Sequence, residues 1–124
     1  MDSRLRTAAA VVSAGRIALG AALIVAPERI ARGWIGPAAT ERSVEVLARS
    51  VGIRDVALGA GGAAALLGGG GSARAWLIGA AVADAGDLVA TLLARDVLPA
   101  NGVRGTAVLA GGSAAICSAA ASQV

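Results

Sequence analysis

The sequence predicts an all-α protein, a transmembrane four-helix bundle, and three observations support this fold class. First, 56% of the 124 residues are hydrophobic and the mean hydropathy is +0.74, above the level of an ordinary soluble domain. Second, the apolar residues form four stretches, each near the roughly 20 residues that a helix needs to cross a bilayer. Third, every proline lies between these stretches. The length suits one domain, residues 1–124.

The expected helices span residues 7–26, 43–67, 75–94 and 102–121. Pro27 and Pro37 follow the first stretch, and Pro99 precedes the fourth. Glycines from Gly68 to Gly71 separate the second stretch from the third. Proline interrupts a helix and glycine favours turns, so these residues mark helix ends. Four spans place both chain ends on one side of the membrane.

The first stretch also has features of a secretory signal peptide, because Arg4 and Arg6 precede an apolar run. Arg16 interrupts that run, which favours a retained helix. The connection after it, PERIARGWIGPAATER, is amphiphilic and is expected to form a short helix on the membrane surface. Trp34 in this connection and Trp76 at the start of the third stretch are expected at the membrane–water boundary.

The composition also excludes classes of partner. All 11 basic residues are arginines, and with 8 acidic residues they give a net charge of +3. The arginines are spread along the chain and lack aromatic neighbours, so no nucleic-acid partner is expected. The absence of histidine and the single Cys117 argue against a zinc or iron–sulfur site. We therefore expect no metal and no cofactor.

Charged residues lie near the middle of three stretches. Arg16 lies in the first, Arg54 and Asp55 in the second, and Asp84 and Asp87 in the third. A charge at the centre of a bilayer costs about 2.5–3.5 kcal/mol on insertion scales, so such side chains normally face the bundle interior and pair. The three helices are therefore expected to bring these charges together at one level.

This level contains two arginines and three aspartates, which leaves one carboxylate in excess. A buried surplus carboxylate is expected to hold a proton, a cation or a cationic ligand, as a general acid or base does. The candidate catalytic residues are Asp84, Asp87 and Asp55. The candidate substrate-binding residues are Arg16, Arg54, Trp76 and Thr91. In the alternative interpretation, the Arg–Asp pairs only lock the helices together.

Two further patterns resemble known motifs weakly. Residues Gly59 to Ala64 fit the dinucleotide pattern G-x-G-x-x-A, but Gly68 to Gly71 would fall inside the helix that this motif needs. The Asp84-x-x-Asp87 pair resembles the Mg²⁺-binding motifs of membrane lipid synthases. Those motifs are longer and use a second set of aspartates, so this reading is not favoured.

The segments GIRDVALG (Gly52 to Gly59) and WLIGAAVADAGD (Trp76 to Asp87) carry a family resemblance. Their layout resembles that of small four-helix integral membrane proteins of actinobacteria, and is loosely similar to the DoxX-like group. The resemblance implies a four-helix bundle with an Arg–Asp core and no particular reaction. The bias toward Ala, Gly and Arg likewise suits a bacterium with a GC-rich genome.

Three functions remain open, all in the bacterial inner (plasma) membrane as a multi-pass protein. The first is a site that binds or transforms a lipophilic small molecule, with an aspartate as acid or base and an arginine on an anionic or carbonyl oxygen. The second is an accessory or assembly subunit of a membrane complex. The third is a proton- or ion-coupled transporter or channel. The expected partners are the lipid bilayer, a lipophilic small molecule, and a homo-oligomer or larger membrane complex.

Overall fold

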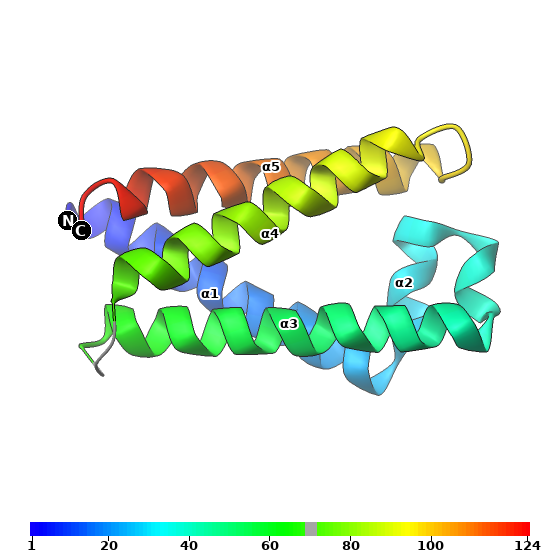
Figure 1. Ribbon diagram of the computed structural model, residues 1–124, viewed down its shortest axis with the longest axis horizontal. Coiled ribbons are helices and arrows are strands. Elements are labelled where there is room, and N and C mark those ends of the chain that lie inside the picture. Colours follow the sequence, from blue (N-terminus) through cyan, green and yellow to red (C-terminus); the bar gives the residue numbers. More distant parts are fainter. Residues whose placement is uncertain (69–71) are drawn as a thin grey trace.

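The computed structural model describes residues 1–68 and 72–124, and these residues form helices and their connections (Figure 1). Within this part of the chain the elements are α1 (Ser3–Val25), α2 (Pro27–Ile35), the 3-10 helix η1 (Pro37–Thr40), α3 (Arg42–Leu66), α4 (Ala73–Leu93) and α5 (Ala100–Ala121). The all-α prediction is confirmed. The four long helices correspond to the four predicted stretches, with ends shifted by a few residues.

The four long helices run alternately up and down along the long axis of the molecule (Figure 1). Both chain ends lie at one end of the molecule, while α2 and the α4–α5 connection lie at the other. Gly68 follows α3 with a φ of 85°, a conformation that glycine adopts readily. The rest of the predicted glycine break, residues 69–71, lies outside the described residues.

Glycines bring α1 and α3 into backbone contact. A Cβ atom added to Gly52 of α3 would lie 2.6 Å from the carbonyl oxygen of Gly20 in α1. One added to Gly59 would lie 2.6 Å from the carbonyl oxygen of Ser13. Real Cβ atoms do not approach backbone oxygens so closely, so only glycine fits these positions. Such small-residue contacts are typical of helix pairs in membranes.

The helices thus form two closely packed pairs, α1 with α3 and α4 with α5, which contact each other less extensively. Two apolar clusters are buried in the molecule, one between the two pairs and the other where α2 and η1 pack on α1 and α3. One includes Ala9, Leu77 and Ala120, toward the chain ends, and the other includes Leu23 and Ala48, toward α2. Both are made mostly of small side chains, which explains how the chain packs without phenylalanine or tyrosine.

Residues 27–42 form α2, η1 and the start of α3. Pro27 occupies the first turn of α2, where its missing N–H is tolerated, and Gly36 ends the helix with a φ of 85°. Ala31 is buried against the long helices, while Glu28 and Arg32 are exposed. The predicted short helix is therefore present, with its polar side facing outward.

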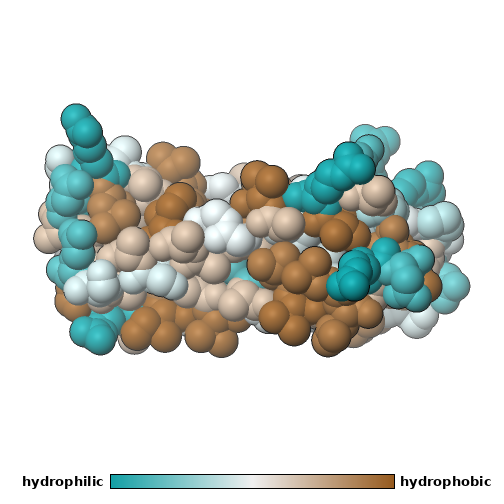
Figure 2. Space-filling view, turned by 90° about the horizontal axis from the view of Figure 1, so that it is seen from above, coloured by the Kyte–Doolittle hydropathy of each residue, from teal (hydrophilic) through white to brown (hydrophobic). Residues whose placement is uncertain are grey.

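Among the described residues, three helices are long and apolar enough to cross a membrane: α1, α4 and α5. The sequence predicts a fourth span over residues 43–67, but α3 does not reach this level of apolarity. The reason is its charge, since Glu45 and Arg49 lie in its first half and Arg54 and Asp55 in its middle. Figure 2 shows hydrophilic residues toward the two ends and mainly apolar or small residues between them.

Candidate functional site

Arg16 of α1 connects three helices inside the protein. Its Nη1 donates a hydrogen bond of 2.8 Å to Oδ1 of Asp55 in α3. Its Nη2 pairs with Oδ2 of Asp84 in α4 and lies 3.4 Å from the carbonyl oxygen of Ala80. The side chains of Arg16, Asp55 and Asp84 are each less than 10% exposed. Arg16 therefore forms a buried, charge-assisted link between the two helix pairs.

Arg54 of α3 forms a second link to α4. Its Nη1 and Nη2 donate to Oδ1 and Oδ2 of Asp87 at 2.9 and 2.6 Å, the bidentate geometry that guanidinium and carboxylate groups favour. Its Nη2 also lies 3.2 Å from Oδ1 of Asp55, the oxygen that Arg16 contacts. We call these five side chains, Arg16, Arg54, Asp55, Asp84 and Asp87, the charged network.

Two further elements contact the charged network. Ser113 of α5 donates a hydrogen bond of 2.5 Å to Oδ2 of Asp84. Thr91 of α4 donates to the carbonyl oxygen of Asp87 at 2.7 Å and accepts a bond of 2.9 Å from the indole N–H of Trp34 in α2. Every α-helix of the described chain therefore contributes a side chain to this site or to its border.

The charged network carries two positive and three negative groups when all are ionised. Its buried polar atoms are nevertheless paired, because no buried side-chain nitrogen or oxygen among the described residues lacks a hydrogen-bond partner. Asp84 accepts hydrogen bonds from the guanidinium of Arg16 and from the hydroxyl of Ser113. The hydrogen bonds thus stabilise charge in the interior, but two guanidinium groups are shared among three carboxylates.

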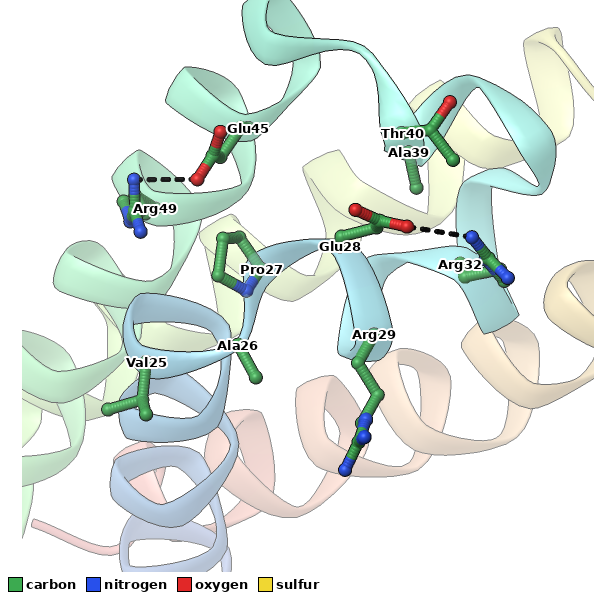
Figure 3. A pocket seen from close by; sticks show the side chains of 10 residues that line it. All are labelled: Val25, Ala26, Pro27, Glu28, Arg29, Arg32, Ala39, Thr40, Glu45 and Arg49. Atoms are coloured by element: carbon green, nitrogen blue, oxygen red, sulfur yellow. Dashed lines mark hydrogen bonds and ion pairs between the residues drawn. The ribbon is translucent and has the colours of Figure 1, made fainter.

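Two pockets in the described part of the chain lie away from the charged network. One has a volume of about 500 Å³ and lies where α1, α2 and α3 meet (Figure 3). The other, of about 290 Å³, lies between α4 and α5 beside Arg74 and Ile78. Neither pocket is lined by a residue of the charged network. They therefore do not provide the closed cavity around Asp84 that a small-molecule site requires.

The structure brings together most of the residues singled out from the sequence. Three candidate acids (Asp55, Asp84 and Asp87) and both arginines (Arg16 and Arg54) form the charged network, and Thr91 borders it. Trp76 lies apart, because its ring packs over Gly61 of α3 toward the chain ends. The catalytic and substrate-binding roles of these residues stay predictions.

Sequence reasoning missed two contacts. Ser113 lies near the middle of the fourth stretch, but nothing in the local sequence indicates that it faces Asp84. The indole N–H of Trp34, a residue expected at the membrane–water boundary, bonds to Thr91. The partners in this bond are 57 residues apart, so local periodicity does not reveal it.

Fold and site define a small helical protein with membrane-length apolar helices and an internal network of arginine and aspartate. Comparisons of the chain with protein-family models, with curated proteins and with solved structures find no match. The resemblance to actinobacterial and DoxX-like membrane proteins therefore stays a prediction.

Proposed function

We propose that the chain is a multi-pass protein of the bacterial plasma membrane in which all four long helices form a transmembrane bundle. The apolar length of α1, α4 and α5 supports this placement. The charges in the middle of α3 are compatible with it, because Arg54 and Asp55 pair with groups on α1 and α4. The common location of the two chain ends fits an even number of spans.

The observation that carries the functional proposal is the partial exposure of the outer ion pair. The side chains of Arg54 and Asp87 remain 33% and 21% exposed, whereas those of Arg16 and Asp84 are almost fully buried. Arg54 lies in the middle of α3, so in a bilayer this exposed surface would face hydrocarbon. Charged groups are costly there even when paired, and in membrane proteins they normally face the bundle interior or a water-filled cavity.

We therefore assign the chain the role of an accessory or assembly subunit, whose partner covers the exposed part of the Arg54–Asp87 pair between α3 and α4. The partner is a second copy of the chain or another membrane protein. The buried Arg16 link gives the subunit a fixed arrangement of its helix pairs, and the outer pair provides a polar contact for assembly. Polar side chains commonly bind membrane helices together in this way.

The size of the protein purified in a mild detergent tests this role. We expect the wild type to elute as an assembly larger than its own 11.9 kDa chain, measured by light scattering with correction for detergent. The variant Arg54→Leu/Asp87→Leu replaces the ion pair with apolar side chains and should elute as a folded monomer. Arg95→Leu, which changes an exposed arginine at the end of α4, is the matched control and should assemble as the wild type does. A monomeric wild type without any bound protein would contradict the proposal.

A second candidate is the acid–base site for a lipophilic small molecule. It is supported by the surplus carboxylate and by the two donors, Arg16 and Ser113, that converge on Asp84. Binding of a hydrophobic amine or carbonyl compound that is lost in Asp84→Asn but kept in Asp96→Asn would favour this candidate over the assembly role.

A further inference from the structure

The pocket at the junction of α1, α2 and α3 has a mixed charge lining that the proposed assembly role does not use (Figure 3). Its volume of about 500 Å³ falls in the range of small-molecule sites. Its polar lining consists of two carboxylates and three guanidinium groups with the hydroxyl of Thr40. Val25, Ala26 and Pro27 form its apolar side.

Two ion pairs flank this pocket. Arg32 pairs with Glu28 of α2 at 2.8 Å, and Arg49 pairs with Glu45 of α3 at 2.8 Å. Figure 3 shows the two pairs on different sides of the junction, while the side chain of Arg29 turns away from both. Solvent-exposed pairs of this kind contribute only about 0–1 kcal/mol. Their groups can therefore exchange partners with a ligand at little cost.

The position of the pocket identifies the environment of such a ligand. It lies at the end of α1, where the chain leaves its first apolar helix. If the long helices span the bilayer as proposed above, on which this inference rests, the pocket lies at the level of the lipid headgroups. Val25 is 81% exposed at its edge and offers apolar surface to the upper part of an acyl chain.

We propose that this pocket binds the headgroup of a phospholipid that carries both a phosphate and an ammonium group. Arg32 and Arg49 bind the phosphate oxygens, for which the forked guanidinium is well suited. Glu28 and Glu45 accept hydrogen bonds from the ammonium group. A purely anionic headgroup fits less well, because Glu28 and Glu45 would receive no new hydrogen-bond donor in place of the guanidinium groups that turn to the phosphate.

The test compares lipids that differ only in the headgroup. Purified protein in detergent is titrated with phosphatidylethanolamine, phosphatidylcholine or phosphatidylglycerol of the same acyl chains, and thermal unfolding is followed by circular dichroism. We expect phosphatidylethanolamine to raise Tm by roughly 4 °C near saturation, and the other two lipids to raise it clearly less. Phosphatidylcholine shares the phosphate but cannot donate hydrogen bonds from its methylated nitrogen.

Variants assign the effect to the pocket. Arg32→Gln/Arg49→Gln should abolish the rise in Tm, and Glu28→Gln/Glu45→Gln should remove the preference for phosphatidylethanolamine over phosphatidylcholine. Arg95→Gln removes an exposed arginine at the same end of the molecule, outside the pocket, and should respond as the wild type does.

Three outcomes overturn the proposal: an equal rise with all three lipids, a rise that persists in the double arginine variant, or an equal rise with free phosphoethanolamine, which would assign the site to a soluble ligand. Extraction of bacterial membranes with alkaline carbonate tests the membrane placement separately. A protein that stays in the membrane pellet but shows no headgroup preference would overturn only the lipid site.

Discussion

Replacing Arg16 with methionine removes the guanidinium that Asp55 and Asp84 share. The two carboxylates are affected unequally. Asp55 keeps its contact with Arg54 at 3.2 Å, whereas Asp84 keeps only the hydroxyl of Ser113. The variant thus leaves one buried carboxylate without a cation, and breaking a buried pair in this way costs about 3–5 kcal/mol. We expect Arg16→Met to lower the free energy of unfolding by this amount.

The assay is denaturant unfolding in detergent micelles, followed by far-ultraviolet circular dichroism. A second substitution makes the result specific, because Arg16→Met/Asp84→Asn removes the charge that the first change leaves unpaired. The double variant should recover about 2 kcal/mol of the loss, a coupling energy in the range found for residues in direct contact. If Arg16→Met unfolds within about 0.5 kcal/mol of the wild type, as an ordinary surface substitution does, Arg16 does not join the helix pairs.

Two further predictions follow from other contacts. Gly52→Ala should destabilise the protein by about 1–3 kcal/mol, because the added Cβ would meet a backbone oxygen. Gly15→Ala, which has open space around the added Cβ, should be neutral or slightly stabilising. Thermal unfolding compares the two variants. Trp34→Phe should cost about 1 kcal/mol through loss of the bond to Thr91, measured by denaturant unfolding.

The sequence was most informative about the positions of the helices. Long apolar stretches bounded by proline or by a run of glycines predicted the four long helices, because proline disrupts a helix interior and consecutive glycines destabilise one. The sequence was less informative about whether α3 crosses the membrane. The charges at Arg54 and Asp55 lower the apolarity of this helix, and only the partners on α1 and α4 show how they are compensated.

The charged network could be predicted because a charged side chain in an apolar stretch needs a partner. Five charged side chains at one depth can pair in only a few ways. The pairing itself could not be predicted. Which arginine contacts which aspartate depends on the rotation of α1 against α3, and that rotation is fixed by the backbone contacts at Gly20, Gly52 and Gly59. The contact of Trp76 with Gly61 could not be predicted for a similar reason, since it depends on the approach of α3 and α4.

We propose above that the α3–α4 face lies inside the membrane and is covered by protein. A nitroxide label at Ala57→Cys, an exposed position one turn from Arg54, tests it directly in native membranes, with Cys117 replaced by alanine. We predict that the label is shielded both from oxygen, which concentrates in lipid, and from a water-soluble nickel complex, whereas a label at Val108→Cys on α5 is accessible to oxygen. High oxygen accessibility at residue 57 would show that lipid covers this face, and high nickel accessibility would show that water does; either result would contradict the account.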